Sequence, residues 1–265
     1  MIAELNGKPI EPSALSGLAL YNYGHFTSLT ADRGKVRGLG LHLDRLQRDC
    51  RAVHGCDLDR DEARRLIGRV AVQVDGASVL RVTVFDPALD LGHPGEDLRP
   101  QCLVTSRRAP TNAPGPIALS VAEYVRDWPE VKHVGLFATV ALRRAAQLDG
   151  YDDVAFHDGQ GRLSEGATWN LGFIDVDGTV ILPDQPSLPG VTLQLLCEAL
   201  DKHGIGWRER TIRVDDASAM TAGFVTNAAV GVRPVSVFNG SVLDAHHPLL
   251  ADLRRQYSEI TAEAI

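Results

Sequence analysis

The sequence predicts an α+β fold of two domains, in which helices flank antiparallel or mixed sheets. Several Asx-Gly pairs lie between short apolar or β-branched stretches, among them Asn6-Gly7, Asp158-Gly159, Asp177-Gly178 and Asn239-Gly240. Such pairs tolerate positive φ and are typical of hairpin turns, so the strands around them should be antiparallel. Other stretches repeat apolar residues at helical spacing. Hairpins together with amphipathic helices indicate an α+β architecture.

The first half of the chain is expected to contain two helices followed by a strand. Residues 41–54 form an amphipathic helix if the apolar positions share one face, namely Leu43, Leu46, Cys50 and Val53. A second helix should begin near Asp61-Glu62 and end at Val72, because acidic residues favour a helix N-terminus. Residues 78–85 are rich in valine and leucine, which predicts a strand.

The second half predicts two more helices, which end at glycines. Residues 138–148 should form a helix that stops at Gly150, and residues 192–203 a helix that stops at Gly204. Between the halves, residues 108–116 contain three prolines and a glycine, a composition typical of a linker. We therefore expect a small N-terminal α+β domain at 1–108, a linker at 109–116 and a larger C-terminal domain at 117–265.

Composition excludes several classes of protein. A chain of 265 residues with 44% hydrophobic content can bury a sizeable core, and a formal charge of −7 argues against a nucleic-acid or anionic-membrane surface. The four cysteines show no metal-ligand spacing, and His246-His247 has no matching acid or cysteine, so no metal site is expected. No apolar run approaches the ~20 residues of a membrane span. The expectation is a soluble, cytoplasmic protein with reduced thiols.

One lysine stands out because the chain has only four. Lys8, Lys35 and Lys202 lie near turns or a helix end, whereas Lys132 precedes an apolar helix. A lysine amine can become neutral and attack a carbonyl, which arginine cannot do. Downstream come Glu165 and the segment Leu188-Pro189-Gly190-Val191-Thr192.

Together these residues predict a site for pyridoxal 5'-phosphate. The cofactor needs a lysine for its aldehyde, an acid beside its pyridine nitrogen and donors for its phosphate. Lys132 and Glu165 suit the first two roles. The N-terminus of the helix that starts near Gly190 suits the third, with Arg45 as a second phosphate clamp.

Each residue also has an ordinary structural interpretation. A single lysine before a helix is more often solvated, and a glutamate near a turn usually lies on the surface. Pro-Gly-Val-Thr can simply begin a helix, and an arginine on an amphipathic helix usually belongs to the solvated face. The functional interpretation therefore depends on the order and spacing of these residues.

In order and spacing, the motifs resemble those of class IV aminotransferases, the fold-type IV pyridoxal phosphate enzymes. The matching segments are Tyr23-Gly24-His25-Phe26-Thr27, His42-Leu43-Asp44-Arg45-Leu46, Lys132-His133 with Gly150-Tyr151-Asp152-Asp153, Glu165-Gly166 with Asn170, Leu188-Pro189-Gly190-Val191-Thr192, and Phe224-Val225-Thr226-Asn227-Ala228 with Val232-Arg233-Pro234-Val235. The resemblance implies a homodimer with the cofactor between a small and a larger domain. It also assigns cofactor contacts to these positions: Arg45, Lys132, Glu165, Val191, Thr192, Thr226, Asn227 and Ala228.

The resemblance implies transamination between an amino acid and a 2-oxo acid, in ping-pong order, as the leading activity. A 4-amino-4-deoxychorismate lyase, which eliminates pyruvate to give 4-aminobenzoate, is the alternative. Thr226-Asn227-Ala228 and Phe26-Thr27-Ser28 resemble the lyase version, and Leu136-Phe137 replace the tyrosine that branched-chain aminotransferases carry after the lysine. A third hypothesis is a cofactor-binding protein without turnover. The substrate carboxylate is expected to meet Arg81, with Arg107, Arg108 and His25 as weaker candidates. In the lyase alternative, Thr27 would carry a proton near the substrate.

Overall fold

The computed structural model describes all 265 residues, and they form two compact units. The first comprises Met1–Thr111, Val131–Gly135 and Thr261–Ile265, and the second comprises Asn112–Glu130 and Leu136–Ile260. None of the helices combines the length and apolarity needed to cross a lipid bilayer. The predicted α+β fold is confirmed, since each unit contains one sheet with helices against it.

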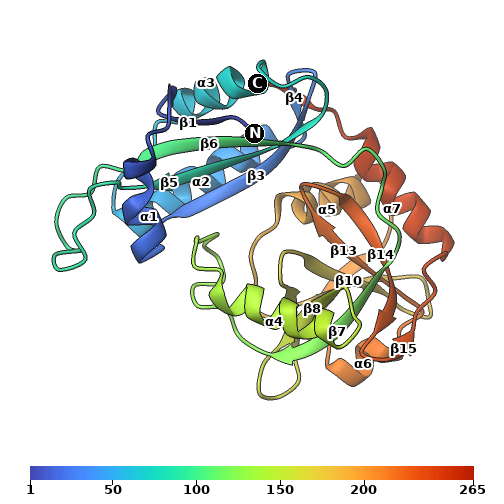
Figure 1. The fold of residues 1–265 in the computed structure, drawn as a ribbon. Coiled ribbons are helices and arrows are strands. Elements are labelled where there is room, and N and C mark those ends of the chain that lie inside the picture. The colour runs from blue at the N-terminus through green and yellow to red at the C-terminus, as the bar shows by residue number, and fades with distance from the viewer. The chain divides into compact units, whose positions relative to one another are not determined.

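The first unit is a seven-stranded antiparallel sheet with two long helices on one face (Figure 1). From edge to edge its strands are β16 (Glu263–Ala264), β4 (Lys35–Val36), β3 (His25–Asp32), β5 (Ser78–Phe85), β6 (Gln101–Arg108), β1 (Ala3–Leu5) and β2 (Lys8–Pro9). The helices are α2 (Leu39–His54) and α3 (Arg60–Ala71), with a short 3-10 helix (Pro12–Leu15) and α1 (Ser16–Tyr21) before them.

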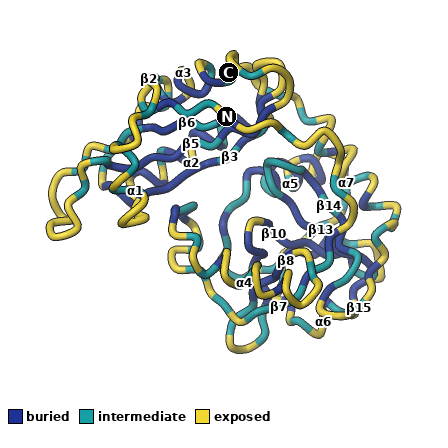
Figure 2. Tube along the Cα trace, in the orientation of Figure 1, coloured by how far each residue is buried: buried dark blue, intermediate teal, exposed yellow.

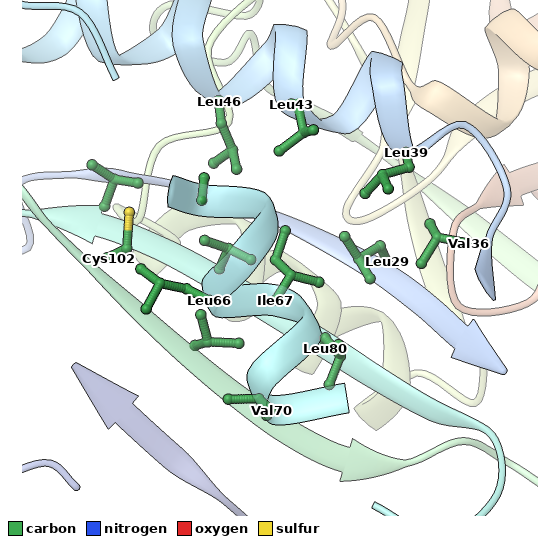
Figure 3. Close-up of a cluster of buried hydrophobic side chains, with 14 of the residues drawn as sticks. Leu29, Val36, Leu39, Leu43, Leu46, Leu66, Ile67, Val70, Leu80 and Cys102 are labelled. Atoms are coloured by element: carbon green, nitrogen blue, oxygen red, sulfur yellow. The ribbon is translucent and has the colours of Figure 1, made fainter. Parts of the chain in front are cut away.

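The core of this unit lies between the two long helices and the sheet. Figure 3 shows Leu39, Leu43 and Leu46 of α2 gathered with Leu66, Ile67 and Val70 of α3 and with Leu29, Leu80 and Cys102 of the strands. Helix α3 begins where the Asp59 carboxylate accepts the N–H groups of Asp61 and Glu62, both at 3.0 Å. Helix α2 ends at Gly55, whose φ of 68° is the left-handed conformation that glycine favours.

The second unit contains a nine-stranded mixed sheet that closes into a barrel. Strands β10, β13, β14, β7, β8 and β9 follow one another, and β9 also pairs with β10 through Glu165 and Asn170. The strands are β7 (Ile117–Glu123), β8 (Asp153–His157), β9 (Leu163–Gly166), β10 (Asn170–Ile174), β11 (Val180–Pro183), β12 (Trp207–Arg210), β13 (Ala222–Asn227), β14 (Gly231–Phe238) and β15 (Ser241–Val242). The helices are α4 (Phe137–Leu148), α5 (Val191–His203), α6 (Val214–Ser218) and α7 (Pro248–Glu259).

Three hydrophobic clusters support this second unit, the smallest of them between α4 and β8. One fills the barrel with residues such as Phe173 and Phe238, and another lies between the sheet and helices α5 and α7. The burial map in Figure 2 shows the barrel strands largely buried. Because α5 packs on β13, the first turn of this helix is held against the barrel.

The predicted elements agree with the structure, with small shifts at their ends. The four predicted helices are α2, α3, α4 and α5, and the predicted strand is β5. The four Asx-Gly pairs named above lie in hairpin connections, although beyond Asp158 the glycine with positive φ is Gly161. Residues 109–116 contain neither helix nor strand. The domain boundaries at 108 and 117 stay predictions, and the observed first unit includes Val131–Gly135.

Candidate active site

The segment that carries Lys132 is fixed to the first unit by backbone hydrogen bonds. The Phe26 N–H donates to the Lys132 carbonyl at 2.8 Å, and the Val134 N–H donates to the Gly24 carbonyl at 3.0 Å. The Lys132 N–H donates to the buried Asp49 carboxylate of α2 at 3.0 Å. Its Nζ lies 5.0 Å from the centroid of the Phe26 ring. The lysine backbone is therefore held between strand β3 and helix α2.

Arg45 is buried, so the ordinary alternative for this arginine, a position on the solvated face of the helix, is wrong. Its Nη2 donates to the Thr27 hydroxyl, and that hydroxyl lies 2.7 Å from His42 Nδ1. Burial lowers the pKa of Arg45 to about 10, against the opposing effect of Asp49. The pKa of His42 lies well below its usual value, mainly because the ring is buried and also because of the charges of Arg45 and Lys132. A neutral His42 can accept the Thr27 proton, which leaves the Thr27 oxygen to accept from Arg45.

The candidate substrate residues of the first unit lie on two opposite faces of the sheet. Side chains alternate along a strand, and paired residues of neighbouring strands share a face. The pairings Arg81 with Thr105 and Val79 with Arg107 place both arginines on one face, whereas His25 and Thr27 share the face with the core residue Leu29. The structure therefore brings Arg81 and Arg107 together and separates them from His25 and Thr27.

Arg81 has the geometry of a half-buried anion ligand. Its guanidinium carbon lies 3.6 Å from the centroid of the Phe26 ring, and its Nε donates to the Thr83 hydroxyl at 3.2 Å. Burial lowers its pKa, and none of the ion pairs in the structure includes it. Arg107 is exposed. Arg81 is therefore the better placed of the two to bind a carboxylate.

His25 lies in a different environment. Its ring is fully buried, neither ring nitrogen has a hydrogen-bond partner, and the His54 ring centroid lies 5.5 Å away. Burial lowers the pKa of His25 to about 3, with smaller contributions from His54 and Arg48. The imidazole is therefore neutral at physiological pH and brings no positive charge to a substrate.

In the second unit, Glu165 is buried at the end of β9 and held from two sides. Its Oε1 accepts from Arg126 Nε at 2.7 Å, and the exposed fraction is only 4% for the Glu165 side chain and 9% for that of Arg126. Its Oε2 accepts the Leu188 N–H at 3.4 Å. A surface position for Glu165 is therefore wrong, and the carboxylate has a fixed orientation.

The turn after Leu188 fits tightly against Asn170. Asn170 Nδ2 donates to the Leu188 carbonyl at 2.7 Å, and a Cβ at Gly190 would lie 1.9 Å from Asn170 Oδ1. Only glycine allows this approach. The backbone of Leu188 therefore connects the two side chains. Its N–H donates to Glu165, and its carbonyl accepts from Asn170.

The N-terminus of α5 and two threonines are equipped to hold an anion. Helix α5 begins at Val191 without a side-chain cap, so its first N–H groups are available to a ligand. The hydroxyls of Thr192 and Thr226 are buried without a hydrogen-bond partner. Such groups destabilise a protein unless a ligand or water satisfies them, and a phosphate has the required acceptors. Val191 is buried at the same helix start.

Asn227 is the last residue of β13, and Ala228 follows it in the turn to β14. Asn227 Oδ1 accepts the N–H groups of Ala229 and Val230, both at 3.0 Å, and its Nδ2 donates to the Thr168 carbonyl at 3.4 Å. The side chain of Asn227 therefore shapes this turn.

A cavity of about 450 Å³ lies beside α5, bordered by Asn170, Leu188 and Gly190. The charged residues that line it are all acidic: Asp184, Glu198 and Glu209. A phosphate is therefore better suited to the helix N-terminus than to this cavity.

Sequence reasoning missed Arg126 and Asp49. Asp49 lies four residues after Arg45 and next to Cys50, on the buried face of α2, so a charged residue in an apolar stripe could have indicated it. Arg126 lies in an irregular segment, and no periodic pattern singles it out.

Comparisons with known proteins found a matching family model, two curated relatives and solved structures of similar fold. Residues 24–238 match the family model described as amino-transferase class IV. A probable branched-chain-amino-acid aminotransferase of Rickettsia felis is 26% identical over 128 residues, which are 47% of this chain and 44% of that protein. The corresponding protein of Rickettsia conorii is 23% identical over the same share of each chain. The alignments thus span less than half the length of these curated relatives.

Solved structures share the fold across nearly the whole chain. A hypothetical aminotransferase from Mycobacterium tuberculosis in its PLP-bound form has a TM-score of 0.84 at 18% identity, covering 97% of this chain and 98% of that one. The form of that protein bound to alpha-ketoglutarate and PMP has a TM-score of 0.83, with the same 18% identity and the same coverage. A branched-chain aminotransferase from Thermoproteus uzoniensis with norvaline has 0.85 at 19%, covering 97% and 93%. A putative 4-amino-4-deoxychorismate lyase from Legionella pneumophila has 0.84 at 18%, covering 92% and 93%.

Proposed function

The chain belongs to the class IV aminotransferase family, as its motifs predicted, and we propose that it is a pyridoxal-phosphate-dependent aminotransferase. The proposed reaction moves an amino group from an amino acid to a 2-oxo acid in ping-pong order. The hypothetical aminotransferase from Mycobacterium tuberculosis supports this choice of cofactor and acceptor. One of its forms is PLP-bound, and another is bound to alpha-ketoglutarate and PMP. We further propose that the protein works as a homodimer.

The residues of the chain fit the cofactor, and the observation that carries the proposal is the pair of buried, unpartnered threonine hydroxyls. Thr192 and Thr226, with the uncapped start of α5, would hold the phosphate. Arg45 is the proposed anion ligand of the first unit, because its buried Nε also lacks a hydrogen-bond partner.

Lys132 is the proposed nucleophile and proton carrier. When bound, the cofactor supplies an aldehyde for an amine and a ring that accepts electrons from a substrate carbanion. The Lys132 amine would bind that aldehyde and, once displaced by the substrate, carry the α-proton. Asp49 fixes the lysine backbone, so the side chain starts from one position. The surrounding residues thus hold the Lys132 amine in position for proton transfer.

Glu165 is the proposed partner of the pyridine nitrogen. The Arg126 guanidinium and the Leu188 N–H fix both carboxylate oxygens. A carboxylate held in this way needs no reorganisation when positive charge develops beside it. Arg126 is a positioning residue in this proposal, because it acts through Glu165.

Arg81 is the proposed ligand of the substrate carboxylate. Its half-buried guanidinium lies against Phe26, whose ring is also near the Lys132 amine. An arginine without an acidic partner in a partly apolar environment binds a carboxylate strongly. Arg107, on the same face but exposed, would contribute less.

A 4-amino-4-deoxychorismate lyase is the second candidate, favoured by Thr27. The Thr27 hydroxyl forms a buried chain with Arg45 and His42, an arrangement that can hold a proton. Non-catalytic cofactor binding is the third candidate.

Two reaction mixtures separate these candidates. The purified protein with cofactor is given an amino-donor panel plus 2-oxoglutarate, and separately aminodeoxychorismate alone. An aminotransferase forms glutamate in the first mixture and no pyruvate in the second. Pyruvate release without a 2-oxo acid would establish the lyase, and cofactor colour that no donor bleaches would establish a binding protein.

A further inference from the structure

Two cysteines outside the proposed cofactor site lie close enough to react with each other. Cys50 on α2 and Cys56 in the connection to α3 have their sulfur atoms 4.0 Å apart, and both are free thiols. We propose that they form a reversible disulfide, and that this thiol pair is an oxidation site of the protein. Cys102 is buried and Cys197 belongs to the other unit.

The geometry requires only a small movement. A disulfide has an S–S length of about 2.05 Å, so the sulfurs must approach by about 2 Å. Residues 55–59 between the two helices and the last turn of α2 can share this movement. Gly55 has a left-handed φ of 68°, and a Cβ built on it would meet nothing within 4 Å. The connection is therefore not packed against neighbouring atoms at its first residue.

Exposure assigns an order to the two thiols. Cys56 is partly exposed, whereas Cys50 is fully buried. A peroxide would reach Cys56 first and oxidise it to a sulfenic acid, while the peroxide becomes an alcohol or water. The Cys50 sulfur then attacks the Cys56 sulfur and displaces the hydroxyl, which leaves as water after taking the Cys50 proton. Two thiols and one peroxide thus give one disulfide, one alcohol and one water, and a dithiol reverses the change.

The pair is connected to the Lys132 segment through α2. Cys50 follows Asp49, whose carboxylate accepts the Lys132 N–H at 3.0 Å and the Arg48 guanidinium at 2.7 Å. Drawing Cys50 towards Cys56 moves the last turn of α2 and loosens this hydrogen bond. This consequence concerns the backbone of Lys132 and does not depend on the proposed reaction.

Peptide mapping tests the disulfide. The full chain is treated with hydrogen peroxide, its remaining thiols are blocked, and it is cut with trypsin without reduction. Cleavage after Arg51 places the two cysteines on separate peptides, 49–51 and 52–60. We expect these peptides to remain joined, with a mass two hydrogens below their sum, and to separate after dithiothreitol. Joining of Cys50 to Cys102, Cys56 sulfinic acid without a link, or no oxidation would overturn the proposal.

Two cysteine variants control this test. Cys56→Ser should abolish the joined peptides, whereas Cys197→Ser, a matched partly buried cysteine on α5, should leave them unchanged.

Amide hydrogen exchange tests whether the disulfide affects the Lys132 segment. Exchange at the Lys132 amide should be faster in the oxidised protein than in the reduced protein, and unchanged by peroxide in Cys56→Ser. Equal exchange in the oxidised and reduced protein would overturn the connection.

Discussion

The contact between Gly190 and Asn170 gives a prediction whose size follows from the coordinates. In Gly190→Ala, the new Cβ would lie 1.9 Å from Asn170 Oδ1, so the asparagine must move. Movement breaks the buried 2.7 Å bond from Asn170 Nδ2 to the Leu188 carbonyl. A buried polar group left without its partner costs about 1–3 kcal/mol. We therefore expect Gly190→Ala to lower the free energy of unfolding by about 2 kcal/mol.

Thermal unfolding and a double-mutant cycle measure this effect. A loss of about 2 kcal/mol in a chain of this size lowers Tm by roughly 4–8 °C. Asn170→Ala removes the same hydrogen bond, so the double variant should cost little more than either single change. Gly206→Ala is the matched control, because a Cβ there meets nothing within 4 Å, and we expect a change below about 0.5 kcal/mol. Additive costs, or an unchanged Tm in Gly190→Ala, would refute the reasoning.

Three further predictions test the remaining residues. Arg126→Leu leaves the Glu165 carboxylate buried without its ion-pair partner, so denaturant unfolding should show a loss of about 3–5 kcal/mol; an unchanged midpoint would show that the pair is dispensable. Arg81→Gln should raise KM for the amino donor by roughly 10- to 100-fold with a small change in kcat, because a charge-assisted carboxylate contact is worth about 1.5–3 kcal/mol; equal effects of Arg107→Gln would contradict the assignment. The pKa of His25 is lowered to about 3, so the unfolded chain binds the proton first and stability falls as pH drops from about 6.5 towards 3. About 1.6 kcal/mol should be lost between pH 6.5 and 5, and His25→Gln should reduce this slope.

The sequence predicted the helices and hairpins well, because apolar periodicity and Asx-Gly turns are local signals. The stripe of Leu43, Leu46 and Cys50 became the buried face of α2, and the Asn6-Gly7 pair became the turn between β1 and β2. The closure of the second sheet could not be predicted in this way. It depends on the pairing of Glu165 with Asn170, a contact that the spacing of apolar residues does not encode.

The order and spacing of motifs identified the candidate site residues, but the residues that surround them could not be predicted from the sequence. Nothing in the sequence indicates that Arg126 pairs with Glu165, since the two are 39 residues apart and lie in an irregular segment and a strand. Thr27 of β3 and Arg81 of β5 lie on opposite faces of the sheet. This separation depends on the register of the two strands, which the sequence does not give. The roles of these residues stay predictions.

Borohydride trapping decides whether Lys132 binds the cofactor. The protein is mixed with pyridoxal 5'-phosphate, reduced with borohydride and mapped by mass spectrometry, with Lys132→Arg as the control. We predict a phosphopyridoxyl group on Lys132 alone and none in the variant. A label on Lys8, Lys35 or Lys202 instead, or no label at all, would contradict the proposed function.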